Sequence, residues 1–144
     1  MKIQGKYVFN APRERVWEVL LDHTKLASCI PGCKKLDPIG QDQYEAELEM
    51  GVASIKGSYR GKVSIVDQQP PQYYKLLVEG TGGQSFVKGE GRLNLTQDGQ
   101  KTVVLVEGEA ELGGTIARVG QRLVGGAAKL LMDRFFKCMQ RHVK

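Results

Sequence analysis

Residues 115–141 read TIARVGQRLVGGAAKLLMDRFFKCMQR and form the longest helix-like stretch of the chain. Their apolar side chains recur every three or four positions, as on one face of an amphipathic helix: Ile116, Val119, Leu123, Ala127, Leu130, Leu131, Phe135 and Met139. A helix over this range would be about 40 Å long. No other segment with a helical pattern can cover a broad apolar surface, so this stretch decides the fold.

The segments before this helix alternate apolar and polar side chains, which predicts β-strands with one buried face. In residues 43–50, QYEAELEM, the glutamates fall on one face and the apolar side chains on the other. Residues 2–9 begin the series, and the same alternation recurs in residues 57–67, 72–80, 85–96 and 102–112. Short links with turn residues join the later strands, which predicts an antiparallel meander.

Two short helical segments follow the first strand. Residues 10–22, NAPRERVWEVLLD, carry Pro12 in the first turn, where proline suits a helix. Residues 23–32, HTKLASCIPG, form a short helical or looped link that ends at Pro31 and Gly32. We therefore predict an α+β fold in which a curved antiparallel sheet wraps around the long C-terminal helix.

Glycine is unusually frequent, at 18 of 144 residues against about 7% on average. Several glycines occupy inward positions of the predicted strands: Gly57, Gly61, Gly89, Gly91 and Gly108. Gly125 and Gly126 lie inside the long helix, where each costs about 1 kcal/mol relative to alanine. Close packing would also use small residues, but missing side chains on both surfaces favour a hollow. We expect Gly126 to face that hollow and Gly125 to lie nearer its edge.

The inward positions predict the wall of an apolar ligand site between the sheet and the helix. The link at residues 23–33 is expected to act as a lid, with its apolar side chains at the mouth. The predicted ligand-binding residues are Leu26, Ile30, Leu48, Met50, Tyr59, Leu76, Val78, Val106, Ala110, Val119, Leu123, Gly126, Ala127 and Leu130.

The charge distribution argues against nucleic-acid binding. The net charge is +5, but acidic and basic side chains are interleaved along the strands, whereas nucleic-acid binders gather basic residues on one face. Basic side chains crowd the end of the final helix: Lys129, Arg134, Lys137, Arg141 and Lys144. They either complement the negative end of the helix dipole or bind anionic lipid headgroups or an acidic partner.

The cysteines and histidines are too few for a disulfide framework or a standard metal site. Cys29, Cys33 and Cys138 are an odd number, and the N-terminus lacks the apolar run of a signal peptide. We therefore predict a cytoplasmic protein with reduced cysteines that serve as small apolar residues. His23 could join Cys29 and Cys33, but the spacing matches no zinc pattern and a fourth ligand is missing. We expect neither metal nor cofactor.

Four motifs together resemble the carbon monoxide dehydrogenase G-subunit (CoxG) family, of the START-like or SRPBCC superfamily of Bet v 1-like helix-grip domains. They are NAPRERVWEVLLD (10–22), IPGCKKL (30–36), IKGSYRGKVSIVDQQPPQYYKLLVEGTG (55–82) and GGTIARVGQRLV (113–124). The resemblance implies one START-like domain over residues 1–144, with seven strands and a deep apolar cavity. START-like domains use that cavity for lipids, sterols, quinones or polyketides. CoxG proteins are associated with molybdenum-containing CO dehydrogenases and with their maturation or membrane attachment.

Two functions are compatible with this resemblance. The first is a non-catalytic carrier of a lipid, quinone or similar molecule, accessory to a CO dehydrogenase-type enzyme complex, with a peripheral membrane contact through the basic helix end. The second is a cyclase or dehydratase acting on a hydrophobic substrate. Acid–base catalysis needs a titratable group near the substrate, and the inward positions offer mainly Tyr44, Tyr59 and Tyr74. This favours the carrier and predicts no catalytic residue.

Overall fold

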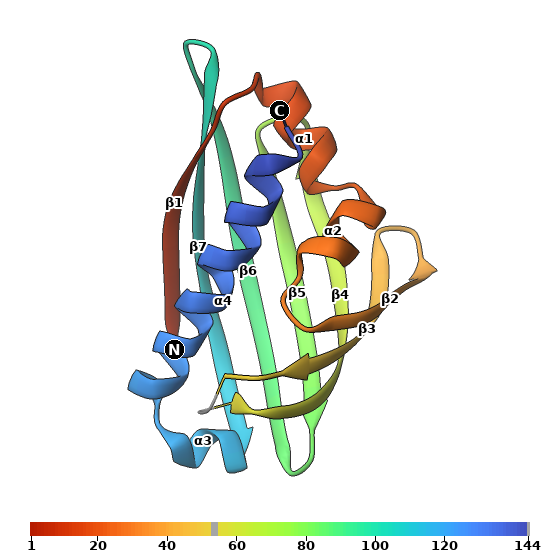
Figure 1. Ribbon diagram of the computed structural model, residues 1–144, viewed down its shortest axis with the longest axis vertical. Helices are drawn as coiled ribbons and strands as arrows, with labels where there is room; N and C mark the ends of the chain where they lie inside the picture. The colour runs from red at the N-terminus through yellow and green to blue at the C-terminus, as the bar shows by residue number, and fades with distance from the viewer. Residues whose placement is uncertain (53–54, 144) are drawn as a thin grey trace.

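The computed structural model describes residues 1–52 and 55–143. Within these residues, seven strands form one antiparallel sheet with the strand order β1-β7-β6-β5-β4-β3-β2 (Figure 1). The strands are β1 (Lys2–Phe9), β2 (Cys33–Gly40), β3 (Gln43–Met50), β4 (Gly57–Gln69), β5 (Tyr73–Gly82), β6 (Ser85–Asp98) and β7 (Lys101–Gly114). Helices α1 (Arg13–Leu20) and α2 (His23–Cys29) join β1 to β2, and α3 (Thr115–Val119) and α4 (Gln121–Arg141) follow β7. The predicted α+β helix-grip architecture is confirmed.

Strand β2 is the element that alternation of side chains does not reveal. It lies at the edge of the sheet beside β3, and Leu36 is its one buried residue. Its pairing with β3 is interrupted between Pro38 and Gly40. An edge strand tolerates proline because the backbone groups along its outer edge form no hydrogen bonds to another strand. A strand exposed on both faces carries no alternating pattern, so β2 is not visible in the hydropathy of the sequence.

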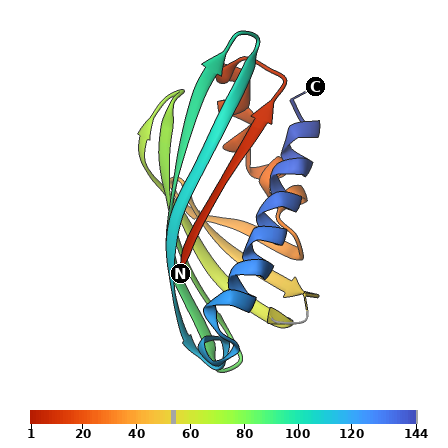
Figure 2. The ribbon, with the colours of Figure 1, turned by 90° about the vertical axis from the view of Figure 1, so that its left-hand side faces the viewer.

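The sheet is strongly curved, and α4 lies along its concave face (Figure 2). Glycines meet across neighbouring strands, where Gly61 pairs with Gly80 and Gly91 with Gly108. An added Cβ at Gly61 would lie 2.9 Å from the carbonyl oxygen of Glu79, and one at Gly108 would lie 2.5 Å from a carbonyl oxygen of β6. Glycine at positions 61 and 108 therefore lets the backbones approach closely and the sheet bend.

The long C-terminal helix is interrupted once. Gly120 has a φ of +98° and separates α3 from α4, a backbone conformation that glycine adopts without a steric penalty. The expected continuous helix over residues 115–141 is therefore two helices. The break also resets which side chains of the two helices face the sheet. No helix in the described part of the chain combines the length and the apolar character needed to span a bilayer.

The densest packing lies at one end of the sheet, where α1 and the C-terminal half of α4 cover β1, β6 and β7. The residues fully buried there are Phe9, Val16, Val19, Leu20, Leu95, Val104 and Met139. Tyr7 stacks on Phe136 with ring centroids 4.2 Å apart. The buried Thr102 hydroxyl donates a hydrogen bond of 2.8 Å to the carbonyl of Ala11. This packed end anchors α4 and leaves the rest of the concave face for the site described below.

The outer face of the sheet carries the alternating charges as cross-strand ion pairs. Arg92 of β6 donates two hydrogen bonds, of 3.0 and 2.9 Å, to the carboxylate of Glu109 on β7. It also donates one of 2.7 Å to Glu90. Arg60 and Glu47 form a similar pair between β4 and β3 at 3.0 Å. Such exposed pairs order the surface but contribute little stability individually.

Glu109→Gln should make the free energy of unfolding depend less on pH in the acid range. The hydrogen bonds from Arg92 lower the pKa of Glu109 in the folded protein. The pair therefore stabilises the fold fully above the unfolded pKa, about 4.3, and this contribution is lost as the pH falls through the lowered folded pKa. Urea unfolding between neutral and acid pH should show a smaller loss of stability in the variant than in the wild type. Glu111→Gln is the matched control, since Glu111 is exposed on the same strand and forms no ion pair with a described residue. A wild-type acid profile for Glu109→Gln would contradict the prediction.

A candidate ligand cavity

Two apolar hollows lie between the sheet and α4. Their volumes are about 340 and 250 Å³, and together they reach the range of roughly 300–1,000 Å³ that is usual for ligand sites. Both hollows are lined by Met50, Val63, Val78 and Leu131. Because they share these wall residues, we treat them as adjoining halves of one cavity, the α2 half and the α3 half.

The larger α2 half lies beneath the short helices, next to the packed core. The segment from α2 to β2 covers it with Leu26, Ile30, Pro31 and Leu36, and the remaining wall comes from the sheet and from α4. The α3 half lies toward the opposite end of α4, where β1, the middle strands and Ile116 of α3 close it. Helix α4 lines both halves with a single row of side chains: Val124, Ala128, Leu131, Met132, Phe135 and Phe136.

Two inward glycines leave part of this volume open. Gly91 lines the α2 half and Gly80 the α3 half. A Cβ added at Gly91 would meet nothing closer than the Cβ of Leu76 at 4.0 Å. At Gly80 the nearest atom would be the carbonyl oxygen of Arg60 at 3.6 Å. Neither glycine is needed for a close backbone approach, so each one keeps space free in the cavity.

The structure brings most of the predicted site residues into the wall: Leu26, Ile30, Leu48, Met50, Tyr59, Leu76, Val78, Val106 and Ala110. All of them belong to strands or to the segment at residues 23–33. In strands, one inward residue determines the orientation of every second neighbour. Their contact with a ligand, and the lid role of the segment at residues 23–33, stay predictions.

The predicted wall residues from the C-terminal helices lie outside the cavity: Val119, Leu123, Gly126, Ala127 and Leu130. Leu123 is 60% exposed and Leu130 is 41% exposed. The expectation that Gly126 faces inward is wrong, because it is exposed and an added Cβ there would meet no atom of the described residues within 4 Å. Ala127 is buried without lining either half. The predicted row is rotated by about one residue, from Leu123 to Val124 and from Leu130 to Leu131.

This error has a physical origin. The break at Gly120 removes the helical phase that Ile116 and Val119 would impose on α4. Leu130 and Leu131 are adjacent, so either one can belong to an apolar row, and the two rows lie on different faces of the helix. The spacing of Val124, Ala128, Leu131 and Phe135 is also helical, so the correct row was present in the sequence as a competing pattern. Had the helical spacing been counted from a residue after Gly120, it would have given the correct row.

Gly126→Ala should stabilise the protein by up to about 1 kcal/mol. The position is exposed in the middle of α4, and a methyl group there has free space. The gain comes from helix propensity alone, so urea unfolding should show a raised midpoint with an unchanged slope. A lower midpoint would contradict the prediction, because it would mean that the added methyl group disturbs a contact outside the described residues.

Polar groups of the wall are few. The ring of Tyr44 stacks on that of His23 with centroids 5.2 Å apart, and His23 donates through Nε2 to the carbonyl oxygen of Leu36. Burial raises the pKa of Tyr74, so its phenol stays protonated. Arg60 and Glu79 are exposed residues that border the α3 half where their carbonyl oxygens lie beside Gly80 and Gly61.

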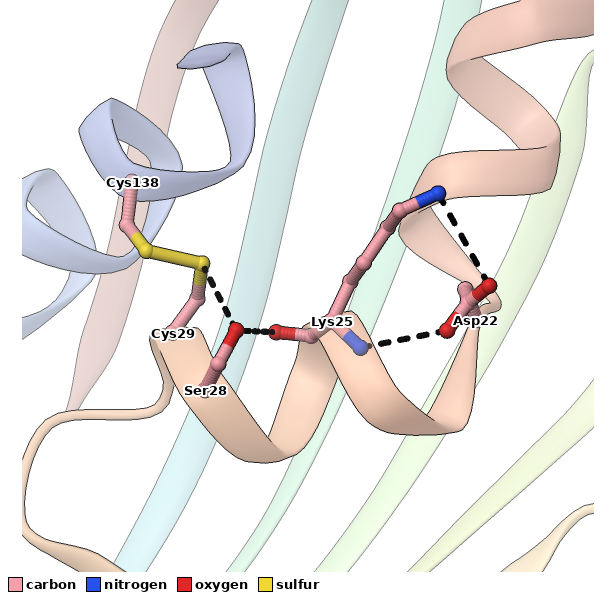
Figure 3. The surroundings of a disulfide bond; sticks show 5 residues. All are labelled: Asp22, Lys25, Ser28, Cys29 and Cys138. Atoms are coloured by element: carbon pink, nitrogen blue, oxygen red, sulfur yellow. Dashed lines mark hydrogen bonds and ion pairs between the residues drawn. A yellow bond between two sulfur atoms is a disulfide. The ribbon is translucent and has the colours of Figure 1, made fainter. Parts of the chain in front are cut away.

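A disulfide bond joins Cys29 at the end of α2 to Cys138 on α4 (Figure 3). Their Cα atoms are 5.5 Å apart across a sequence separation of 109 residues. The expectation of reduced cysteines is therefore wrong for this pair, while Cys33 is free. Helix α2 is further held by Asp22, whose side chain accepts a 3.1 Å hydrogen bond from the backbone of Lys25. The disulfide ties the segment that covers the α2 half to the helix that forms its opposite wall.

A curved antiparallel sheet closed by a C-terminal helix, with an apolar cavity between them, defines a START-like protein. Within that class, the chain belongs to the carbon monoxide dehydrogenase G-subunit (CoxG) family, whose model matches residues 5–144. This confirms the family resemblance carried by the four sequence motifs.

Solved structures share the fold along nearly the whole chain. A conserved protein from Geobacillus kaustophilus is 42% identical, with a TM-score of 0.96, and the alignment covers 99% of this chain and 95% of that one. A START superfamily protein from Mycobacterium smegmatis is 14% identical, with a TM-score of 0.76 and coverages of 99% and 96%. The ZhuI aromatase/cyclase from a Streptomyces species is 16% identical, with a TM-score of 0.71 and coverages of 99% and 93%. The search of curated proteins found no match.

Proposed function

We propose that this protein is a non-catalytic carrier that holds an elongated apolar molecule, such as a lipid or a quinone, between its sheet and α4. The observation that carries this proposal is the apolar cavity with adjoining halves. Burying an apolar surface there removes it from water at a gain of roughly 25 cal/mol per Å². Among the side chains of the described wall residues, those of Arg60 and Glu79 are the charged ones, and both are exposed.

The shape of the cavity supports an extended ligand. The α4 row that lines it runs from Val124 to Phe136, a span of about 18 Å along the helix axis. The surface that the wall presents to the cavity is almost wholly apolar. A linear, largely apolar molecule therefore suits the cavity better than a compact or charged one.

Native mass spectrometry of the purified full chain tests this proposal directly. We expect a mass increment on the folded protein that solvent extraction releases as a lipid or isoprenoid. Stripped protein should then bind an environment-sensitive fluorescent fatty acid and release it to a short-chain quinone or an unlabelled lipid. Stripped, folded protein that binds no apolar probe would contradict the carrier function.

The proposed partners are a CO dehydrogenase-type molybdenum enzyme and a membrane surface. The membrane contact is supported by the exposed Leu123 and Leu130, which share α4 with the exposed Arg134 and Lys137, because interfacial helices combine apolar and basic side chains. Of the predicted basic cluster, Lys129 is paired with Asp133 at 2.9 Å, and Lys144 lies outside the described residues.

Flotation with anionic vesicles should recover the protein, and Leu123→Ser with Leu130→Ser should abolish recovery. Pull-down of a molybdenum hydroxylase tests the enzyme partner.

The second candidate is a cyclase or dehydratase acting on a hydrophobic substrate in the same cavity. It is favoured by one observation, the stacking of His23 on the wall residue Tyr44. In this function the phenol of Tyr44 would act on the substrate, and the stacked imidazole of His23 would hold its ring in place. Turnover of a polyketide-type substrate that Tyr44→Phe removes would support this function over the carrier.

A further inference from the structure

Three potential metal ligands converge beside the segment that covers the α2 half. The Sγ atoms of Cys29 and Cys138 and a ring nitrogen of His142 all lie within 4.8 Å of one another. Cys29 ends α2, Cys138 lies in the last turns of α4, and His142 caps that helix. Cys138 and His142 are four residues apart, a spacing that places side chains on the same face of a helix.

The ligand set has a specific chemical preference. Two cysteine sulfurs and one imidazole nitrogen form a Cys₂His set, which suits Zn²⁺ and leaves a fourth tetrahedral position for water or another oxygen ligand. Only thiolates bind the metal, so the disulfide and a metal ion exclude each other at this place. The redox state of the cysteines therefore decides which of the two can exist.

We propose that reduction of the Cys29–Cys138 disulfide converts this cluster into a zinc site whose protein ligands are Cys29, Cys138 and His142. A dithiol reductant supplies two electrons and two protons, breaks the S–S bond and leaves as its own disulfide. The two protein thiols then release their protons as their sulfurs bind Zn²⁺. In the reverse step a small disulfide oxidant accepts the two electrons and leaves as its dithiol, the S–S bond re-forms and Zn²⁺ is released.

The geometry requires little rearrangement. Zn–S bonds of about 2.3 Å in a tetrahedral site place two sulfurs roughly 3.8 Å apart. The backbones of α2 and α4 are already close, with the two Cα atoms 5.5 Å apart. After reduction, side-chain rotation at the two cysteines can open the sulfurs to this separation, and the imidazole nitrogen already lies within 4.8 Å of both.

The surroundings also suit a metal. Cys29 is 4% exposed, while Cys138 and His142 are half-buried, which leaves a path for the ion and its water.

The disulfide and the metal ion would each connect α2 to α4. Leu26 belongs to α2 and Ile30 follows it, and both line the α2 half of the cavity together with Phe135 of α4. In the oxidised protein the disulfide holds these walls together, and in the reduced protein the metal would do so. The site itself does not depend on what the cavity binds, so its test is independent of the carrier function.

Cobalt titration of the full chain distinguishes the two states. Protein reduced with a phosphine and handled without oxygen should bind one Co²⁺ per chain, with thiolate-to-cobalt charge-transfer absorption and the visible bands of a tetrahedral site. One equivalent of Zn²⁺ should abolish these bands. Protein kept in the disulfide form should show none of them. A reduced wild type without the charge-transfer absorption, or an oxidised wild type with it, would overturn the proposal without any variant.

Single substitutions then assign the ligands. His142→Ala should weaken Zn²⁺ binding by the reduced protein by about 100-fold or more, beyond the roughly 10–100-fold that is lost with a residue that only orients a ligand. Cys138→Ser should eliminate most of the charge-transfer intensity. Cys33→Ser is the matched control, since Cys33 is the free cysteine outside the cluster, and it should bind Zn²⁺ as the wild type does. Wild-type affinity in His142→Ala, or loss of binding in Cys33→Ser, would refute this assignment.

Discussion

Gly91→Leu is expected to lower the affinity of the stripped protein for a fluorescent fatty acid by roughly 10- to 100-fold. The new side chain would project into the α2 half, where the nearest atom to an added Cβ is 4.0 Å away. It would displace two or three methylene groups of a ligand, each worth about 0.8 kcal/mol when buried, which corresponds to this change in affinity. Fluorescence titration measures the affinity, and circular dichroism melting checks that the variant is folded.

The same substitution at Gly126 is the matched control. Gly126 is exposed on the outer side of α4, so Gly126→Leu should bind the probe as the wild type does. Gly80→Leu separates the two halves of the cavity, because Gly80 lines only the α3 half. A ligand that extends through both halves is sensitive to both inward substitutions. Wild-type affinity in a folded Gly91→Leu variant would show that no ligand occupies the α2 half.

The sheet side of this cavity was predictable because strand geometry has only two side-chain directions. Once the glutamates of residues 43–50 face water, Leu48 and Met50 must face inward, and pairing carries that parity from strand to strand. The inward glycines were predictable for the same reason. Parity does not say which glycines keep space open. Gly91 does so, whereas Gly61 admits a neighbouring backbone, and this difference depends on how the strands coil in three dimensions.

The helix side was less predictable because helical phase accumulates error. Each residue advances the direction of its side chain by about 100°, so an uncertainty of one position moves a residue from the wall to solvent. The break at Gly120 and the pair Leu130–Leu131 supplied that uncertainty. The exposed leucines of α4 are also the residues that burial statistics would place inside.

The disulfide and the Cys₂His cluster could not be predicted from the spacing of the cysteines. Cys29 and Cys138 are separated by 109 residues, and nothing in either local sequence marks the other as its neighbour. They meet because α2 follows the first strand and α4 returns across the concave face to the same end of the sheet (Figure 1). Counting cysteines therefore predicted the wrong redox state for this pair, and the local spacing of His23, Cys29 and Cys33 did not point to His142.

Reduction of the disulfide should lower the free energy of unfolding by about 2–5 kcal/mol. The bond closes a loop that contains most of the sheet, since it links residues 109 apart, and cross-links over long loops restrict the unfolded chain most strongly. Urea unfolding of the oxidised and reduced protein measures the difference, with a chelator present so that no metal replaces the bond.

Two variants assign that loss to this one bond. Cys33→Ser removes the free cysteine and should lose as much stability on reduction as the wild type does. Cys29→Ser with Cys138→Ser should be as unstable as the reduced wild type and should no longer respond to reductant. Adding one equivalent of Zn²⁺ to the reduced wild type in place of the chelator should restore part of the lost stability, because a ligand that binds only the folded state stabilises it. Equal unfolding midpoints for the oxidised and reduced wild type would mean that the bond between α2 and α4 does not restrict the unfolded chain, and that packing alone holds α2 over the cavity.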